Sequence, residues 1–170
     1  MEVTLFEGGE LTPKQTRRRR KKQETASYYW VTTRLLRESG PWYSPSITRP
    51  DAVVSLVNEY LDLENADREH FVVLCLDRKN QVTAVQVVSI GSLSSTVVHP
   101  REVFKTAVLT GSASVIVVHN HPSGDPGPGS EDIAVTKQLV EAGKILGIEL
   151  LDHVIIGNRQ FWSMRGMGQI

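Results

Sequence analysis

The feature that most restricts the fold of this chain is the segment 115–132, with the sequence VIVVHNHPSGDPGPGSED. Its first four residues are β-branched, and such a run between small, turn-forming residues predicts a buried strand. Pro122 ends the strand because proline has no N–H for the sheet ladder. A loop rich in glycine and proline follows, and Ser130 opens a helical pattern. The segment therefore predicts a strand–loop–helix unit.

Two histidines stand at the end of this strand. Side chains of a strand alternate between its two faces, so His119 and His121 point the same way, roughly 7 Å apart at Cα. Asp132, in the first turn of the helix, can swing back over the strand end as a third, anionic ligand. Two histidines and a carboxylate, with one position left for water, are typical of a catalytic zinc. The pattern thus predicts a Zn²⁺ site held by His119, His121 and Asp132.

Simpler interpretations fit the same residues. An isolated His-x-His at a strand end belongs more often to an exposed polar surface than to a metal site. The loop is also compatible with an ordinary strand-to-helix connection, in which Asp132 stabilises the positive end of the helix dipole. Spacing alone leaves these alternatives open.

The motif also resembles a known signature. His-Asn-His-Pro-Ser-Gly-Asp-Pro at residues 119–126, followed by Glu131 and Asp132, is similar to the signature of the RadC family of JAMM (MPN+/JAB) metal-dependent hydrolases. The similarity covers roughly residues 48–164, including segments 98–105 and 147–157. It implies an α/β domain with a mixed β-sheet flanked by helices, in a JAB/MPN-like (cytidine-deaminase-like) fold. It also implies a zinc-dependent metalloprotease that cleaves a peptide or isopeptide amide bond.

The resemblance assigns two further catalytic roles. The JAMM pattern has a general base at the start of an upstream strand, and Glu69, before the apolar run 71–76, holds that place. On the residues alone, Glu69 is a surface glutamate in a charged turn. The pattern also has a serine three residues before the aspartate, where Gly129 stands here. Ser130 follows, and it fits either a shifted oxyanion donor or a cap of the helix.

Residues 1–47 read as a basic arm and linker, and residues 48–170 as the hydrolase domain. Six consecutive positive charges from Arg17 to Lys22 could bind nucleic-acid phosphates, or belong to a solvated, disordered arm through residue 26. Residues 27–39 fit a short helix or a partner-binding segment. Longer RadC proteins carry a helix-hairpin-helix region, and no such Gly-rich hairpin occurs here, so the resemblance implies a short form. The alternative function is a DNA-associated repair module with a catalytically silent metal site.

Composition mainly excludes classes of protein. Nineteen Lys and Arg balance 19 Asp and Glu, so net charge predicts no partner. The single cysteine, Cys75, excludes an intrachain disulfide and fits a core position in a cytoplasmic protein. No run approaches ~20 apolar residues, and no signal peptide is recognised, so no membrane contact is expected. The natural substrate and the oligomeric state leave no signature.

Apolar periodicity predicts the remaining elements. We expect a helix ending near residue 61, a hairpin of strands 71–76 and 81–90, and a helix from Pro100 to about residue 111. A break at 91–95 and an extension at 96–99 follow the hairpin. A helix over 130–146 and a hairpin of strands 148–156 and 160–164 complete the domain. Asp152 and His153 fit a buried, hydrogen-bonded pair, or a partner that orients a ligand histidine.

Overall fold

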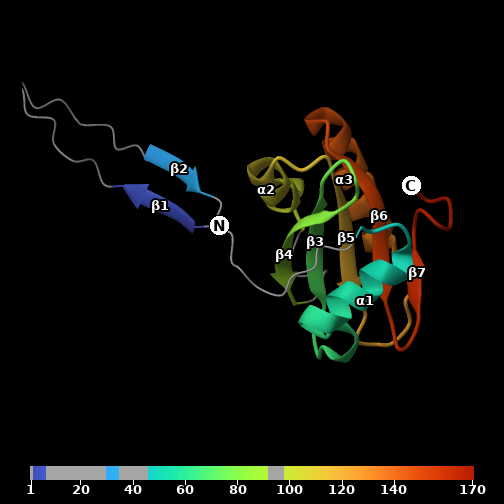
Figure 1. Cartoon of the computed structure of the whole chain (residues 1–170). Helices are drawn as coiled ribbons and strands as arrows, with labels where there is room; N and C mark the ends of the chain where they lie inside the picture. The colour runs from blue at the N-terminus through green and yellow to red at the C-terminus, as the bar shows by residue number, and fades with distance from the viewer. Residues whose placement is uncertain (1, 7–29, 35–45, 92–97) are drawn as a thin grey trace, which may run out of the picture. The chain divides into compact units, whose positions relative to one another are not determined.

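The computed structural model describes residues 2–6, 30–34, 46–91 and 98–170, and it divides the chain into two compact units, 1–41 and 42–170 (Figure 1). In the first unit, strands β1 (Glu2–Phe6) and β2 (Trp30–Arg34) pair antiparallel. A helix, one of the two interpretations of residues 27–39, is therefore wrong at 30–34, where the β-branched Val-Thr-Thr stretch adopts a strand, and the partner-binding interpretation stays a prediction. A disordered arm through residue 26 is likewise wrong for β1. The basic run Arg17–Lys22 lies outside the described residues, so nucleic-acid binding by it stays a prediction.

The second unit carries a mixed five-stranded sheet and three α-helices. Its elements are α1 (Pro50–Leu61), the short 3₁₀ helix η1 (Leu63–Asn65), β3 (His70–Leu76), β4 (Val82–Ile90), α2 (Pro100–Thr110), β5 (Ser114–Asn120), α3 (Ser130–Leu146), β6 (Glu149–Ile156) and β7 (Phe161–Ser163). The strand order is β4-β3-β5-β6-β7, with β5 and β6 parallel and the other neighbours antiparallel. The predicted fold class is confirmed. The expected extension over 96–99 is not part of a strand at Val98 and His99, and residues 92–97 lie outside the described range.

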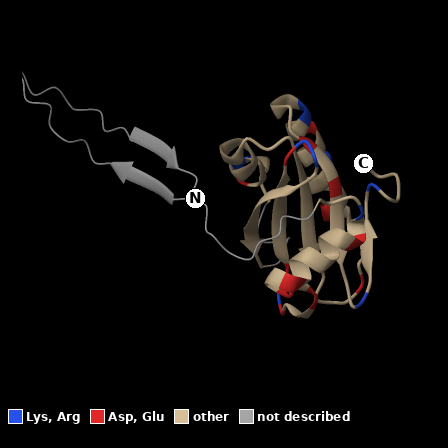
Figure 2. Ribbon diagram, viewed as in Figure 1, with Lys and Arg blue, Asp and Glu red and all other residues tan. Residues whose placement is uncertain are grey.

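Alternation along the central strands divides the core into two layers. Ile116 and Val118 of β5 pack with the apolar side of α1, whereas Val115 and Val117 pack with α2 and α3 on the other face. The sheet is thus covered on both sides, as Figure 1 shows, and β3, β4 and β5 contain no charged residue (Figure 2). Cys75 is buried in the second layer, and this burial raises the pKa of its thiol to about 11, so it stays protonated.

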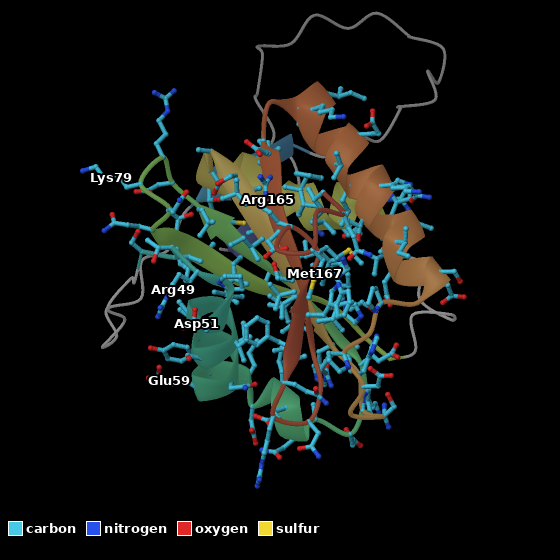
Figure 3. The ribbon with its side chains drawn as sticks, turned by 90° about the vertical axis from the view of Figure 1, so that its right-hand side faces the viewer. Arg49, Asp51, Glu59, Lys79, Arg165 and Met167 are labelled. Atoms are coloured by element: carbon cyan, nitrogen blue, oxygen red, sulfur yellow. The ribbon has the colours of Figure 1, made fainter. Side chains whose placement is uncertain are left out.

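Local interactions fix the ends of the elements around this core. Arg49 precedes α1 and forms a 2.9 Å ion pair with Asp51 in its first turn (Figure 3). His99 caps α2 by accepting a hydrogen bond from the backbone N–H of Arg101. Beyond β7, the Arg165 side chain reaches back to Glu149 at the start of β6, at 2.9 Å. In the described part of the chain, no helix is long and apolar enough to cross a membrane.

Candidate metal centre

The structure brings the three predicted ligands together at the carboxyl end of β5. Nε2 of His119 lies 2.9 Å from Nε2 of His121, and these atoms lie 3.2 and 3.5 Å from Oδ1 and Oδ2 of Asp132, respectively. One candidate ligand atom from each residue falls within 4.8 Å of the others. His119 and Asp132 are buried, and the His121 side chain is 15% exposed. The group is therefore closed toward the core and open at His121.

The β5–α3 connection holds Asp132 over the strand end. Asp132 is the third residue of α3, and its Oδ2 accepts a 2.7 Å hydrogen bond from the backbone N–H of Gly129, the N-cap residue. Part of the simpler interpretation is therefore correct, because one carboxylate oxygen does stabilise the helix start. The other oxygen, Oδ1, is buried without a hydrogen-bond partner among the described residues. A buried carboxylate oxygen left in this way is costly unless a cation compensates it.

A chain of hydrogen bonds fixes the tautomer of His119. The single hydrogen of the Thr136 hydroxyl can be donated to the carbonyl of Asp132 at 2.5 Å, one helical turn back, or to the more distant Sδ of Met164 at 3.2 Å; in either case the hydroxyl accepts from Nδ1 of His153, at 2.5 Å. His153, protonated at Nδ1, then accepts at Nε2 from Nδ1–H of His119 at 2.7 Å. Nε2 of His119 is left with its lone pair facing the cluster. This is how a partner sets which imidazole nitrogen binds a metal.

In His121 a single hydrogen bond sets the tautomer. Its Nδ1–H donates to the backbone carbonyl of Asp125 in the following loop, at 2.7 Å. Nε2 of His121 therefore also turns its lone pair inward. Two lone pairs at 2.9 Å repel each other unless a proton or a metal ion lies between them. We call His119, His121, Asp132, His153 and Thr136 the histidine cluster.

The electrostatics of the histidine cluster agree with this arrangement. Burial opposes ionisation of Asp132, but the adjacent imidazoles of His119 and His121, which attract the carboxylate when they are protonated at Nε2, outweigh it and hold its pKa well below the usual range. The hydrogen bond to Asp132 raises the pKa of His121, with smaller contributions that include the charge of Glu69. Complete burial, reinforced by His119, lowers the pKa of His153 well below its usual value, so His153 stays neutral. The metal-free cluster thus combines an ionised carboxylate with a histidine that readily takes a proton.

Glu69 lies directly before β3 and lines a pocket beside the histidine cluster. The pocket has a volume of about 520 Å³ and is lined by Asp67, Arg68, Glu69, Gly91, Pro122 and Ser123. Pro122 and Ser123 follow His121 in the sequence, so the pocket lies near the carboxyl end of β5, where the histidine cluster also lies. Two glutamates near Glu69 in the sequence lie elsewhere: Glu59 is on α1 (Figure 3), and Glu64 accepts a hydrogen bond from the backbone of Arg159.

Ser130 occupies a different position from the one that capping requires. It is the first residue of α3 and is exposed, while Gly129 is the N-cap. The expectation that Ser130 caps the helix is therefore wrong, and its role as an oxyanion donor stays a prediction. Sequence reasoning missed Thr136, although it stands four residues after Asp132 and hence on the same side of α3. A hydroxyl four residues after a predicted metal ligand on the same helix could have indicated a side chain that contacts the site.

Comparison with known proteins agrees with this geometry. A sequence model of the RadC-like JAB domain matches residues 47–169. A UPF0758 protein of Desulforamulus reducens is 56% identical over 121 residues, which are 71% of this chain and 52% of the relative. UPF0758 proteins of Syntrophomonas wolfei and Methanosarcina barkeri are 55% and 52% identical, over 73% and 72% of this chain and 54% and 52% of their own lengths. The chain spans about half the length of the curated relatives it matches.

Proposed function

Since the chain belongs to the family of RadC-like JAB domains, we propose that it is a zinc-dependent hydrolase that cleaves a peptide or isopeptide amide bond. The observation that carries the proposal is the buried Oδ1 of Asp132, which has no hydrogen-bond partner among the described residues and lies 3.2 Å from Nε2 of His119. A divalent cation held by His119, His121 and Asp132 would satisfy that oxygen and both imidazole lone pairs at once.

The donor set favours zinc among divalent ions. Imidazole nitrogen suits zinc, whereas the harder ions magnesium and calcium prefer oxygen ligands. Three protein ligands leave a fourth position for water, as in catalytic rather than structural zinc sites. Bound zinc lowers the pKa of such a water to ~7, so hydroxide becomes available at neutral pH. In this proposal His153 and Asp125 hold the two imidazoles in the required tautomers.

Glu69 serves as the general base in the proposed reaction. It takes the proton from the attacking water and delivers it to the nitrogen of the leaving amine, which departs as the amide C–N bond breaks. Its place in the pocket next to Pro122 and Ser123 supports this role, as does its electrostatic effect on His121. Ser130 is assigned to the oxyanion, with Gly129 in place of the serine in the JAMM pattern.

The pocket supports a substrate of limited size at the reacting centre. A volume of about 520 Å³ lies within the range of pockets that hold small ligands, and it fits a few residues of an extended chain. Asp67, Arg68 and Glu69 contribute charged side chains to its lining, beside Gly91 and Pro122. We therefore propose that the scissile amide lies in an extended, accessible segment.

Two measurements test the proposed function together. Protein purified without added metal should contain one zinc per chain by elemental analysis. Incubation with a mixture of unfolded peptides, including ε-linked lysine peptides, should generate new amino termini detectable by mass spectrometry. Glu69→Gln should retain zinc but lower turnover roughly 10²–10⁴-fold, because it cannot take a proton. Negligible zinc occupancy that does not rise on zinc addition would contradict the proposal.

A further inference from the structure

Asn120 stands between the two predicted histidine ligands and has no part in the site described so far. Its side chain is buried, with 2% of the residue exposed. Oδ1 accepts a 2.8 Å hydrogen bond from the backbone N–H of His70, and Nδ2 donates to the backbone carbonyl of Arg68 at 3.0 Å. These two residues are the immediate neighbours of Glu69. The amide of Asn120 therefore forms hydrogen bonds with the backbone on both sides of the proposed base.

This contact replaces a missing rung of the sheet. Backbone pairing between β3 and β5 ends at Phe71 and His119, so the next pair would join His70 to Asn120. The side-chain amide carries one acceptor and one donor, as a peptide group does, and it supplies both bonds instead. On the other side, the backbone N–H of Gly91, next to β4, donates to the carbonyl of Glu69 at 2.9 Å. The Glu69 backbone is thus held from two directions.

We propose that Asn120 is a positioning residue that fixes Glu69 relative to the metal ligands. The proposal rests on the proposed function, in which Glu69 is the base. Because His119 and His121 flank Asn120 in the chain, any shift of the end of β5 moves the ligands and the base together. Asparagine suits this task, since aspartate lacks the donor and alanine lacks both groups. A misplacement of about 1 Å can lower a rate about 10²-fold, so a contact that keeps Glu69 at a fixed distance from the metal ligands preserves the rate.

Cobalt substitution tests the proposal without any substrate. The visible spectrum of Co²⁺ in the site should change with pH as a ligand of the ion loses a proton, and the negative charge of Glu69 should oppose that loss. Glu69→Gln should therefore move the transition to lower pH. Asn120→Ala should move it in the same direction by a smaller amount. Ser112→Ala, which removes two partly buried hydrogen bonds near the other end of β5, should leave it unchanged.

A double-mutant cycle separates positioning from general loosening of the fold. If Asn120 acts through Glu69, Asn120→Ala should cause no further shift in the Glu69→Gln background, whereas a merely structural role would cause the same shift in both. An equal shift in both backgrounds overturns the proposal, and so does no shift in either. If Asn120→Ala fails to fold, Asn120→Asp takes its place, because the cycle cancels the effect of its added charge.

Hydrogen exchange and turnover complete the test. In the unmodified protein the amide of His70 should exchange as slowly as those of β5, and rapid exchange would overturn the proposal, since Oδ1 of Asn120 is its acceptor. On any peptide that the protein cleaves, Asn120→Ala should lower kcat about 10- to 100-fold with little change in KM. If the protein binds Co²⁺ but cleaves no peptide, the proposed hydrolase function is contradicted. The double-mutant cycle measured by the Co²⁺ spectrum still tests whether Asn120 positions Glu69.

Discussion

Two polar clusters lie at opposite ends of β5, and they differ in burial and in how far their polar groups are paired. Near its start, a hydroxyl cluster is formed by Thr83, Thr110 and Ser112. There the Thr83 hydroxyl donates to the carbonyl of Cys75 at 3.1 Å, and that of Thr110 donates to the carbonyl of Thr106 at 2.8 Å. Ser112 lies within hydrogen-bond distance of both hydroxyls, at 3.2 and 2.7 Å. Each donor in the hydroxyl cluster therefore finds an acceptor within the protein.

The histidine cluster at the other end is not complete in this sense. It holds a buried carboxylate oxygen without a hydrogen-bond partner among the described residues, and two imidazole lone pairs that face each other. Buried polar groups are almost always satisfied, so the exception calls for an explanation. The difference teaches that a group of polar side chains in mutual contact does not by itself mark a site. What distinguishes the histidine cluster is a buried carboxylate oxygen and two facing imidazole lone pairs, which a cation could satisfy together. The two clusters should therefore respond to mutation in different ways.

The largest expected effect is on metal binding when one histidine is removed. His121→Ala deletes a ligand from the open side of the site, so zinc affinity should fall by more than the 10–100-fold that loss of an outer partner typically costs. The fold should persist, because the side chain is partly exposed and lies beyond the end of β5. Competition with a chelator measures the affinity, and circular dichroism checks the fold. An affinity equal to that of the unmodified protein would show that the histidine cluster is only another structural polar group.

The contrast between these clusters also shows how far the sequence could lead. His119, His121 and Asp132 sit in one strand–loop–helix unit, so local periodicity was enough to predict that their side chains meet. His153 depended on the pairing of β6 with β5, which contains an irregularity after Leu150 that no local pattern announces. Asp152 and His153 are both buried because helices cover both faces of the sheet, and the two interpretations offered for them hold together. His153 contacts His119, while Asp152 accepts a hydrogen bond from the backbone of His153.

The remaining differences between prediction and structure have similar causes. Helix ends and strands of the second unit were predicted within one or two residues, because proline, glycine and apolar periodicity mark them clearly. The contact of Asn120 with the chain beside Glu69 joins residues 50 and 52 positions apart, and it depends on the register of β3 with β5. The segment around Trp30 was misjudged because its aromatic and basic residues fit either a helix or a strand.

The next effect in size concerns the partner of His119. His153→Phe keeps a planar ring in the core but leaves Nδ1–H of His119 without its acceptor, so the imidazole is no longer held in the metal-binding tautomer. Zinc affinity should fall about 10- to 100-fold. Thr136→Val, one step further along the chain of hydrogen bonds, should cause a smaller loss and serves for comparison. Equal affinities in His153→Phe and the unmodified protein would mean that His153 fills space as Phe71 does.

Acid should weaken metal binding through His121. The hydrogen bond to Asp132 raises the pKa of this histidine in the metal-free protein, so zinc must displace a proton from it below that pKa. His153 adds no such competition, because its pKa is lowered. Affinity should therefore be level at higher pH and fall about tenfold per pH unit once His121 is protonated, beginning above the ordinary histidine pKa of about 6.5. A chelator titration from about pH 5.5 to about pH 8 measures this dependence. A flat profile would mean that His121 does not bind the metal.

The smallest effect should come from the hydroxyl cluster, and it should fall on stability alone. Ser112→Ala removes a hydroxyl that contacts Thr83 and Thr110, but both threonines keep their carbonyl acceptors, so no donor is left without a partner. The free energy of unfolding should drop by about 1 kcal/mol, the usual net contribution of a hydrogen bond. Urea denaturation of the metal-free protein measures this change. Zinc affinity should be unaltered, because Ser112 lies at the opposite end of β5 from the ligands. If Ser112→Ala instead weakened zinc binding as His153→Phe does, the two clusters would be coupled through β5 and their separate roles would be wrong.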